Sequence, residues 1–312
     1  MGQTDVCHLL LGQRNGVAMV VLPVNIFSDI RCTLGEGPAW DASSKSLFWV
    51  DIKGKKVFAA TADGVITNSW STSAQPSAVI LAHSGNKLVT AGQEILEFSA
   101  VSGEMKPYVQ LAGEPSFNRC NDAKCDPVGN LWVGTMDNAE KGRTGRLWRI
   151  DPNGEGKVFL EGIGVANTLA WDRLRGRFYF ADSMVGDIYV FDYNEEKADI
   201  TCRKSFFHRD SAPGVPDGSA IDEEGFLWNA RWDGGCVIRI SPDGELDRVI
   251  EVPARCPTSC AFGGEDMKTL YVTSAASDSS SHEGSDDLGG AVFSIDVDVA
   301  GSRIPPYKGP VR

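Results

Sequence analysis

Short apolar runs of the strand type recur along the whole chain at similar distances. They are rich in leucine, aromatic and β-branched residues, and each follows a turn carrying Gly, Asn, Asp, Ser or Lys. The clearest runs are Leu47–Val50, Leu88–Thr90, Leu131–Val133, Phe178–Phe180, Leu227–Trp228 and Leu270–Val272. No long segment carries the 3.6-residue apolar period of an amphipathic helix. The pattern therefore predicts an all-β protein.

Another short strand precedes each of these runs and ends at one recurrent position. That position is occupied by Asp41, Ala82, Asp126, Asp172, Asp222 and Gly263, so successive copies are 41, 44, 46, 50 and 41 residues apart. A period in the forties with three or four short strands in each unit is typical of propeller blades. Six such units fill the chain. The sequence predicts a single domain over residues 1–312, a six-bladed β-propeller with four-stranded blades around a central channel.

Three segments lie outside this repeat. Ala18–Ile30 is left over at the front, and we expect it to supply an outer strand to the last blade, so that residues 1–24 form an N-terminal extension or part of this closing strand. Such a strand would hide the open sheet edges of the ring. Ser277–Gly290 is rich in Ser, Asp and Gly and is predicted to be a surface loop in the last blade. Ser302–Arg312 is expected to be an edge strand or disordered.

The repeat also selects one set of polar positions. The innermost strand of every propeller blade begins near the axis, so the residues five positions before each recurrent position are equivalent. These residues are Glu36, Ser77, Asn121, Asn167, Asp217 and Thr258. None is apolar, and we expect their side chains to converge at one end of the channel.

Glu36, Asn167 and Asp217 are candidate metal ligands. Two carboxylates that face each other in a poorly solvated channel repel unless a cation or a proton lies between them. Together with the amide they offer three oxygen atoms, which suit one divalent hard cation such as Ca²⁺, Mg²⁺ or Mn²⁺ and leave positions open for water and substrate. Zn²⁺ and Fe²⁺ also accept carboxylates. The alternative, that polar strand starts are ordinary turn residues, is preferred for Ser77 and Thr258.

Composition and charge exclude several other functions. The chain has 42 acidic and 30 basic residues, a formal charge of −12, which argues against a nucleic-acid partner.

No apolar run is long enough to span a bilayer, and the first residues make a poor signal peptide, so a cytoplasmic protein without a membrane partner is expected. The eight cysteines contain no C-x-x-C pair and only four histidines are present, so a Cys/His zinc site is not expected and the thiols are predicted to be buried.

The motifs around the candidate positions resemble those of a known family. In chain order they are Leu34–Trp40, Arg119–Lys124, Gly134–Met136, Ala166–Trp171, Pro216–Gly218 and Thr258–Gly264. From Ile30 to Asp296 the chain resembles the senescence-marker-protein (regucalcin)/gluconolactonase/luciferin-regenerating-enzyme family of sugar lactonases. The resemblance implies a six-bladed propeller that holds one divalent metal ion, with calcium preferred, and hydrolyses sugar lactones to aldonic acids.

The resemblance also implies roles for individual residues. The family's metal ligands fall on Glu36, Asn167 and Asp217, the positions that the repeat selects independently. Its substrate-contacting Arg and Asn fall on Arg119 and Asn121.

The chain departs from the family pattern at three places. The family commonly has Gly where this chain has Ala123 and Thr168, and both departures are expected to alter the local backbone rather than the ligands. In some members a Glu just beyond the Gly-Thr-Met motif contacts the sugar, whereas Asp137–Ala139 occupies that stretch here. This last departure bears on which sugar is bound.

The mechanism that follows assigns a second role to Asp217. As ligand and general base together it would activate the attacking water, because a weak Lewis acid such as calcium increases the need for a carboxylate base. Arg119 and Asn121 would orient the ring hydroxyls, and Arg119 would attract the anionic product. Asp122 either assists substrate binding or is a strand residue paired with Lys124.

Two other functions remain open at this level. One is a calcium-dependent arylesterase or phosphotriesterase on a similar propeller, and the other is a non-enzymatic metal-binding propeller, since fold does not determine function. The sequence does not identify the sugar, the physiological metal or the oligomeric state.

Overall fold

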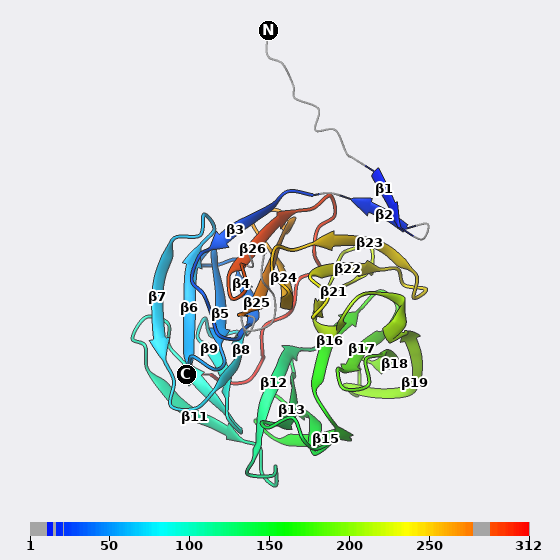
Figure 1. Ribbon diagram of the computed structural model, residues 1–312. Coiled ribbons are helices and arrows are strands. Elements are labelled where there is room, and N and C mark those ends of the chain that lie inside the picture. The colour runs from blue at the N-terminus through cyan, green and yellow to red at the C-terminus, as the bar shows by residue number, and fades with distance from the viewer. Residues whose placement is uncertain (1–10, 15–16, 21, 277–287, 312) are drawn as a thin grey trace.

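Six sheets are arranged around a central axis in this protein. The computed structural model describes residues 22–276 and 288–311, and the backbone alone of residues 11–14 and 17–20. Its antiparallel sheets form a ring of blades, which confirms the predicted six-bladed β-propeller (Figure 1). Among the described residues the only helical turn is the three-residue 3₁₀ turn Arg209–Ser211, and no helix is long and apolar enough to cross a membrane.

Each blade is built from four consecutive strands, except that the last takes its outer strand from the front of the chain. Blade 1 contains β4 (Gly35–Asp41), β5 (Ser46–Asp51), β6 (Lys56–Thr61) and β7 (Ile66–Ser71). Blade 2 contains β8 (Pro76–Leu81), β9 (Lys87–Ala91), β10 (Glu94–Phe98) and β11 (Met105–Gln110). Blade 3 contains β12 (Asn118–Cys125), β13 (Leu131–Asp137), β14 (Gly145–Ile150) and β15 (Gly156–Ile163). Blade 4 contains β16 (Ala166–Asp172), β17 (Arg177–Asp182), β18 (Ile188–Asn194) and β19 (Asp199–Phe207). Blade 5 contains β20 (Val215–Ile221), β21 (Leu227–Trp232), β22 (Cys236–Ile240) and β23 (Leu246–Glu251), extended by β2 (Val17–Val20) and β1 (Leu11–Arg14). Blade 6 contains β24 (Cys256–Gly263), β25 (Thr269–Ala275), β26 (Val292–Asp296) and β3 (Val24–Ser28).

The N-terminal strands close the ring. β3 pairs antiparallel with β26, with Ile26 opposite Phe293, so blade 6 is completed by the segment that leads into blade 1. The strand expected within Ala18–Ile30 is therefore present, but it covers only Val24–Ser28. The preceding strand β2 pairs in parallel with β23 and extends blade 5 instead (Figure 1). Backbone pairing at both places covers strand edges that would otherwise be open.

The aspartate at the recurrent position holds the turn between the first two strands of a blade. Asp126 accepts hydrogen bonds from two backbone N–H groups of the following turn and from Trp132 Nε1 at 2.9 Å. Asp222 does the same in blade 5, where Trp228 Nε1 donates at 2.9 Å. Both carboxylates are fully buried. In blades 3 and 5 the aspartate and the tryptophan six residues later thus form one hydrogen-bonded unit.

The hydrophobic core lies between neighbouring blades. Trp132 of blade 3 packs on Trp171 of blade 4 with ring centroids 5.9 Å apart, and Trp228 of blade 5 meets Phe262 of blade 6 at 5.7 Å. Trp132 and Trp228 are completely buried. Truncating such a ring to alanine typically costs about 3–5 kcal/mol. This packing keeps the first strands at constant positions around the axis.

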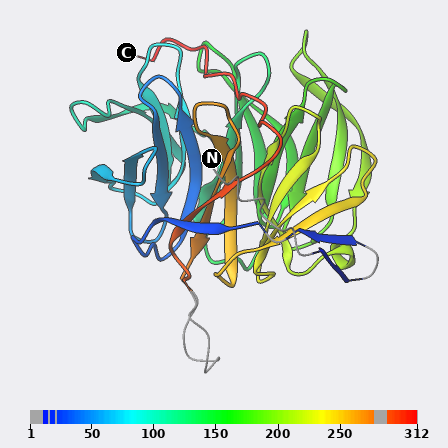
Figure 2. The ribbon, with the colours of Figure 1, turned by 90° about the horizontal axis from the view of Figure 1, so that it is seen from above.

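The described part of the C-terminal segment, residues 302–311, is neither an edge strand nor disordered, so the expectation for Ser302–Arg312 was wrong over these residues. Tyr307 is completely buried, its backbone N–H donates to Leu81 O at 2.8 Å, and its hydroxyl donates to Asp151 O at 2.6 Å. It forms an isolated parallel bridge with Ala82, at the end of the first strand of blade 2. The segment therefore crosses the end of the ring where the first strands finish (Figure 2). Most of the predicted loop of the last blade, residues 277–287, lies outside the described residues.

All seven described cysteines are free thiols. Six are buried as expected, and burial raises the pKa of their thiols, that of Cys120 to about 12. The expectation was wrong for Cys202, which is exposed on the outer strand of blade 4.

Candidate metal and substrate site

A β-bulge interrupts the first strand of every blade near its start. The pairing of β4 with β5 shifts between Glu36 and Ala39, and that of β16 with β17 between Asn167 and Ala170. β8, β12, β20 and β24 shift at the corresponding place. Each first strand also contacts the first strands of both neighbouring blades. Bulges re-aim side chains beside functional sites, and here they gather the polar positions of all six blades at one end of the ring.

Glu36 and Asp217 bring two carboxylates into one electrostatic environment. Burial raises the pKa of Glu36 to about 8, and the negative charge of Asp122 contributes to the rise. Burial also raises the pKa of Asp217 well above its ordinary value, with the charge of Glu36 as the next cause. Neither carboxylate forms an ion pair in the part of the chain that the structure describes. The charge of Glu36 thus opposes the ionisation of Asp217, and the use of the two carboxylates as metal ligands stays a prediction.

Direct hydrogen bonds connect three of the other predicted residues. Asn167 Nδ2 donates to Ser183 Oγ at 2.8 Å, and Asn167 Oδ1 accepts from Asn121 Nδ2 at 3.1 Å. Asn121 Oδ1 accepts from Arg119 Nη1 at 2.7 Å. Arg119 Nε donates to Asn138 Oδ1 at 3.0 Å. The chain of contacts runs from a candidate metal donor of blade 4 to the predicted substrate residues of blade 3.

Arg119 is a buried cation without an acidic partner. Only 6% of its surface is exposed, and burial lowers its pKa. Its hydrogen bonds go to the amide oxygens of Asn138 and Asn121 and to the carbonyl oxygen of Cys120 at 2.9 Å. No carboxylate within the described ranges forms an ion pair with it. The charges of Glu140, Glu36 and Asp217 nevertheless raise its pKa against the effect of burial.

Asp122 lies between the blades rather than in a strand ion pair. Its Oδ2 accepts a hydrogen bond from the backbone N–H of Leu169 at 3.0 Å, which ties β12 to β16. Lys124 Nζ donates instead to Ser219 O in blade 5. The alternative of a direct Asp122–Lys124 ion pair is thus wrong. Contact of Asp122 with substrate stays a prediction.

The remaining two equivalent positions serve the fold. Ser77 Oγ bonds to Thr90 Oγ1 at 2.8 Å, and Thr258 Oγ1 donates to Gly35 O at 2.5 Å. Both residues lie within strands, with their hydroxyl groups satisfied by neighbouring strands. They have no free polar atoms to offer to the channel.

Thr168 and Asn229 hold the backbone of Asp217, and the sequence did not reveal this role. Thr168 Oγ1 donates to Asp217 O at 2.7 Å, and Asn229 Nδ2 donates to the same oxygen at 3.0 Å. Thr168 has φ of +61°, the left-handed region that favours glycine. A threonine here thus adopts a backbone conformation that favours glycine, the residue common in the family. The departure from glycine was the one sequence signal at this position.

Glu36, Asn167 and Asp217 have the donor chemistry that a hard divalent cation requires. Two carboxylates and one amide supply three oxygens, and buried carboxylates without a counterion are costly unless a cation offsets them. The described residues contain no cluster of three His, Cys, Asp or Glu side chains that could hold a metal ion. The candidate site therefore depends on an amide, Asn167, as its third donor.

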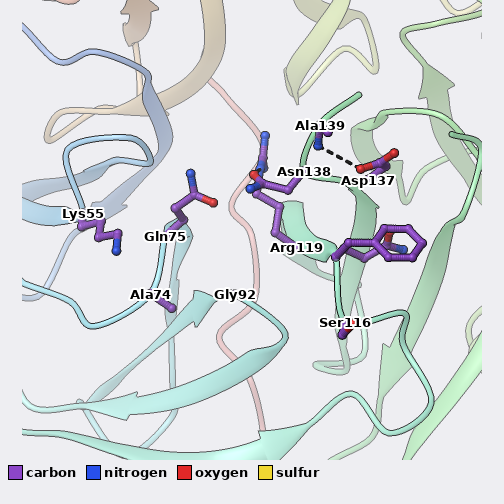
Figure 3. Close-up of a pocket in the computed structure, with 11 residues that line it drawn as sticks. Lys55, Ala74, Gln75, Gly92, Ser116, Arg119, Asp137, Asn138 and Ala139 are labelled. Atoms are coloured by element: carbon purple, nitrogen blue, oxygen red, sulfur yellow. Dashed lines mark hydrogen bonds between the residues drawn. The ribbon is translucent and has the colours of Figure 1, made fainter. Parts of the chain in front are cut away.

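A cavity of about 550 Å³ lies beside these residues (Figure 3). Its lining includes Arg119 but none of the three candidate metal donors. Lys55 of blade 1 and Gln75, at the start of blade 2, also line it, together with Asn138 of blade 3. Through Arg119 the cavity adjoins the chain of contacts that ends at Asn167.

The fold and the site define a six-bladed propeller with two opposed carboxylates, an amide and an unpaired buried arginine at one end of its ring. The chain belongs to the SMP-30/gluconolactonase/LRE-like family, whose sequence model matches residues 34–276. This finding confirms the family resemblance of the motifs.

Two curated relatives span nearly the whole chain. Pentonolactonase XacC of Haloferax volcanii is 34% identical over 290 residues, which cover 91% of this chain and 97% of the relative. Regucalcin of Gallus gallus is 34% identical over 285 residues, which cover 89% and 95%.

Solved structures agree with this assignment. A luciferin-regenerating enzyme superimposes with a TM-score of 0.86 at 29% identity and covers 92% of this chain and 99% of its own. Regucalcin of Agrobacterium tumefaciens, described as a calcium-binding protein, superimposes with a TM-score of 0.85 at 25% identity, with coverage of 92% and 98%.

Proposed function

We propose that this protein is a metal-dependent sugar lactonase that hydrolyses an aldonolactone to the aldonic acid. The observation that carries the proposal is the pair of opposed carboxylates, Glu36 and Asp217, next to the Asn167–Asn121–Arg119 contacts. Relatives with lactonase names support it, among them a 6-deoxy-6-sulfogluconolactonase of Pseudomonas putida that is 32% identical over 282 residues.

Glu36, Asn167 and Asp217 are the residues that would hold one divalent cation. When bound, the cation supplies Lewis acidity toward the lactone carbonyl and the attacking water. Calcium is the first candidate because all three donors are oxygens, and Zn²⁺, Mg²⁺, Mn²⁺ and Fe²⁺ are the alternatives.

The chain's own groups position the substrate and move the proton. The carboxylate of Asp217 accepts the proton of the attacking water, since it is the candidate donor whose backbone Thr168 and Asn229 hold in place. Arg119 and Asn121 orient the ring hydroxyls of the lactone through hydrogen bonds.

The test is a pH-indicator assay on chelated protein reconstituted with single metals. The panel contains aldonolactones, an aryl ester and a phosphotriester. We expect chelator-sensitive hydrolysis of the aldonolactones, and a loss of about 10²–10⁴-fold in kcat for Asp217→Asn and Asp217→Ala. Asp210→Asn removes a carboxylate whose side chain is 95% exposed and serves as the matched control.

Three outcomes would contradict the proposal. Hydrolysis of the aryl ester or phosphotriester alone would indicate the arylesterase type of propeller. Absence of turnover with every metal would indicate a binding protein. Near-native lactone turnover by Asp217→Ala would show that Asp217 is not the general base.

A further inference from the structure

The cavity beside the candidate site carries positive charge in a strongly acidic chain. Lys55 and Arg119 line it, whereas the whole chain has a formal charge of −12. Lys55 follows β5 of blade 1 and Arg119 lies in β12 of blade 3, so two blades contribute one cation each. In Figure 3, Lys55 and Gln75 lie on one side of the open space, and Arg119 and Asn138 lie on the other. This arrangement could hold one anionic group between them.

The acidic lining residue of this cavity is engaged by its own loop. The carboxylate of Asp137 accepts hydrogen bonds from the backbone N–H groups of Ala139 at 2.9 Å, Lys141 at 3.2 Å and Gly142 at 2.9 Å. These bonds, that from Ala139 first, lower the pKa of Asp137. The carboxylate is therefore directed at its loop and forms no ion pair with Lys55 or with Arg119 in the described part of the molecule.

Asn138 keeps Arg119 in place without neutralising it. This residue lies just beyond the Gly-Thr-Met motif, where some family members have a glutamate, and its Oδ1 accepts from Arg119 Nε at 3.0 Å. An amide at this point leaves the guanidinium without a direct ion pair, whereas a carboxylate would form one. The charges of Glu140, Glu36 and Asp217 raise the pKa of Arg119, but none of these three carboxylates lines the cavity.

Lys55 is similarly available to a ligand. Its side chain is exposed, and its Nζ donates to Ser73 O at 3.4 Å, close to the limit of a hydrogen bond. Phe117, which is 55% exposed, adds an aromatic face to the same cavity. Its volume of about 550 Å³ lies within the range of small-molecule sites. A lactone whose carbonyl lies at the metal donors can therefore direct its remote substituent into this cavity.

We propose that the cavity is a subsite for an anionic substituent at the end of the lactone remote from its carbonyl. The inference rests on the proposed function and specifies its substrate class, a lactone of an acidic sugar that carries a carboxylate, sulfonate or phosphate group. Lys55 and Arg119 bind that group by charge-assisted hydrogen bonds from opposite sides. Phe117 contacts the apolar face of the carbon skeleton.

The test compares kcat/KM for a neutral aldonolactone with that for lactones of the same ring bearing a terminal carboxylate, sulfonate or phosphate. The variants are Lys55→Gln and, as the matched control, Lys53→Gln, which removes an exposed lysine of the same turn outside the cavity. We expect the wild type to prefer a charged lactone, and the ratio of charged to neutral kcat/KM to fall about two- to fivefold in Lys55→Gln. Added salt should weaken the preference for the charged lactone, because the interaction of Lys55 with the anionic group is partly exposed to solvent. Lys53→Gln should keep the wild-type ratio.

Two results would overturn the subsite while leaving the lactonase proposal intact. They are a wild type that prefers the neutral lactone over every charged one, and a ratio that does not change in Lys55→Gln. If no lactone is hydrolysed, the proposed function fails instead. In that case the subsite is tested by calorimetric titration of wild type and Lys55→Gln with an open-chain aldarate. Weaker binding to Lys55→Gln would support the subsite, and equal affinity of the two proteins would overturn it.

Discussion

At position 168 we expect alanine to be less stable than glycine, the reverse of the usual order. Thr168 is completely buried, and its φ of +61° is unusual for a β-branched residue. Its hydroxyl compensates this strain, because Oγ1 donates to Asp217 O at 2.7 Å and accepts from Asn229 Nδ2 at 3.1 Å. Thr168→Ala keeps the Cβ that causes the strain and loses the hydroxyl, whereas Thr168→Gly loses both.

The magnitudes follow from these contacts. A left-handed conformation costs about 1–2 kcal/mol for a residue with a Cβ, and each buried hydrogen bond contributes about 1 kcal/mol net. Thr168→Ala should therefore lose about 1–3 kcal/mol of unfolding free energy. Thr168→Gly loses the same hydrogen bonds but also the strain of about 1–2 kcal/mol, offset by about 0.5–1 kcal/mol of backbone entropy in the unfolded chain, so it should lose about 0.5–1 kcal/mol less than Thr168→Ala. Thr168→Ser keeps the hydroxyl and should resemble wild type.

Urea unfolding of chelated protein measures these differences, and lactone turnover of the metal-loaded variants measures positioning. Thr168→Val should lose about tenfold or more in kcat, because a methyl group faces the carbonyl of Asp217 and displaces the base. Thr168→Ser should restore both stability and kcat. An alanine variant as stable as the glycine variant, or a valine variant with native kcat, would refute the reasoning.

Three other measurements test separate parts of the structure. A divalent metal at a hundredfold excess over its Kd should raise the unfolding free energy of wild type by about 3 kcal/mol and should not stabilise Asp217→Asn. Equal stabilisation of both proteins would contradict the role of Asp217 as a metal ligand. Burial opposes the ionisation of Asp41, but hydrogen bonds from a neighbouring serine and from Lys87 at 3.0 Å lower its pKa to about 2. Because this pKa lies below the value in the unfolded chain, the stabilisation by ionised Asp41 is complete above pH 4 and is lost as pH falls toward 2. Over that range wild type should lose about 2 kcal/mol of unfolding free energy relative to Asp41→Asn. Parallel pH profiles of the two proteins would contradict this. Trp132→Phe should cost about 1–2 kcal/mol more than Trp171→Phe in urea unfolding, since only the first indole N–H has a hydrogen-bond partner among the described residues; equal losses would contradict it.

The repeat explains how much of the fold could be predicted from the sequence. Strand alternation recurs in every blade, and an aspartate occupies the recurrent position in four of the six, so counting alone indicated six units. The same counting selected Glu36, Asn167 and Asp217, because equivalent positions of a ring face a common axis. Their use as metal ligands stays a prediction.

What the sequence determined by itself was everything that repeats: the strand period, the number of blades and the polar positions at the strand starts. The tertiary structure alone decided the contacts that occur once, such as the hydrogen bond from Thr168 Oγ1 to Asp217 O, the burial of Tyr307 and the bond from Lys124 Nζ to Ser219 O. These contacts join residues from different blades or from the chain ends. Their partners depend on which atoms meet after the ring closes, and no local period records that.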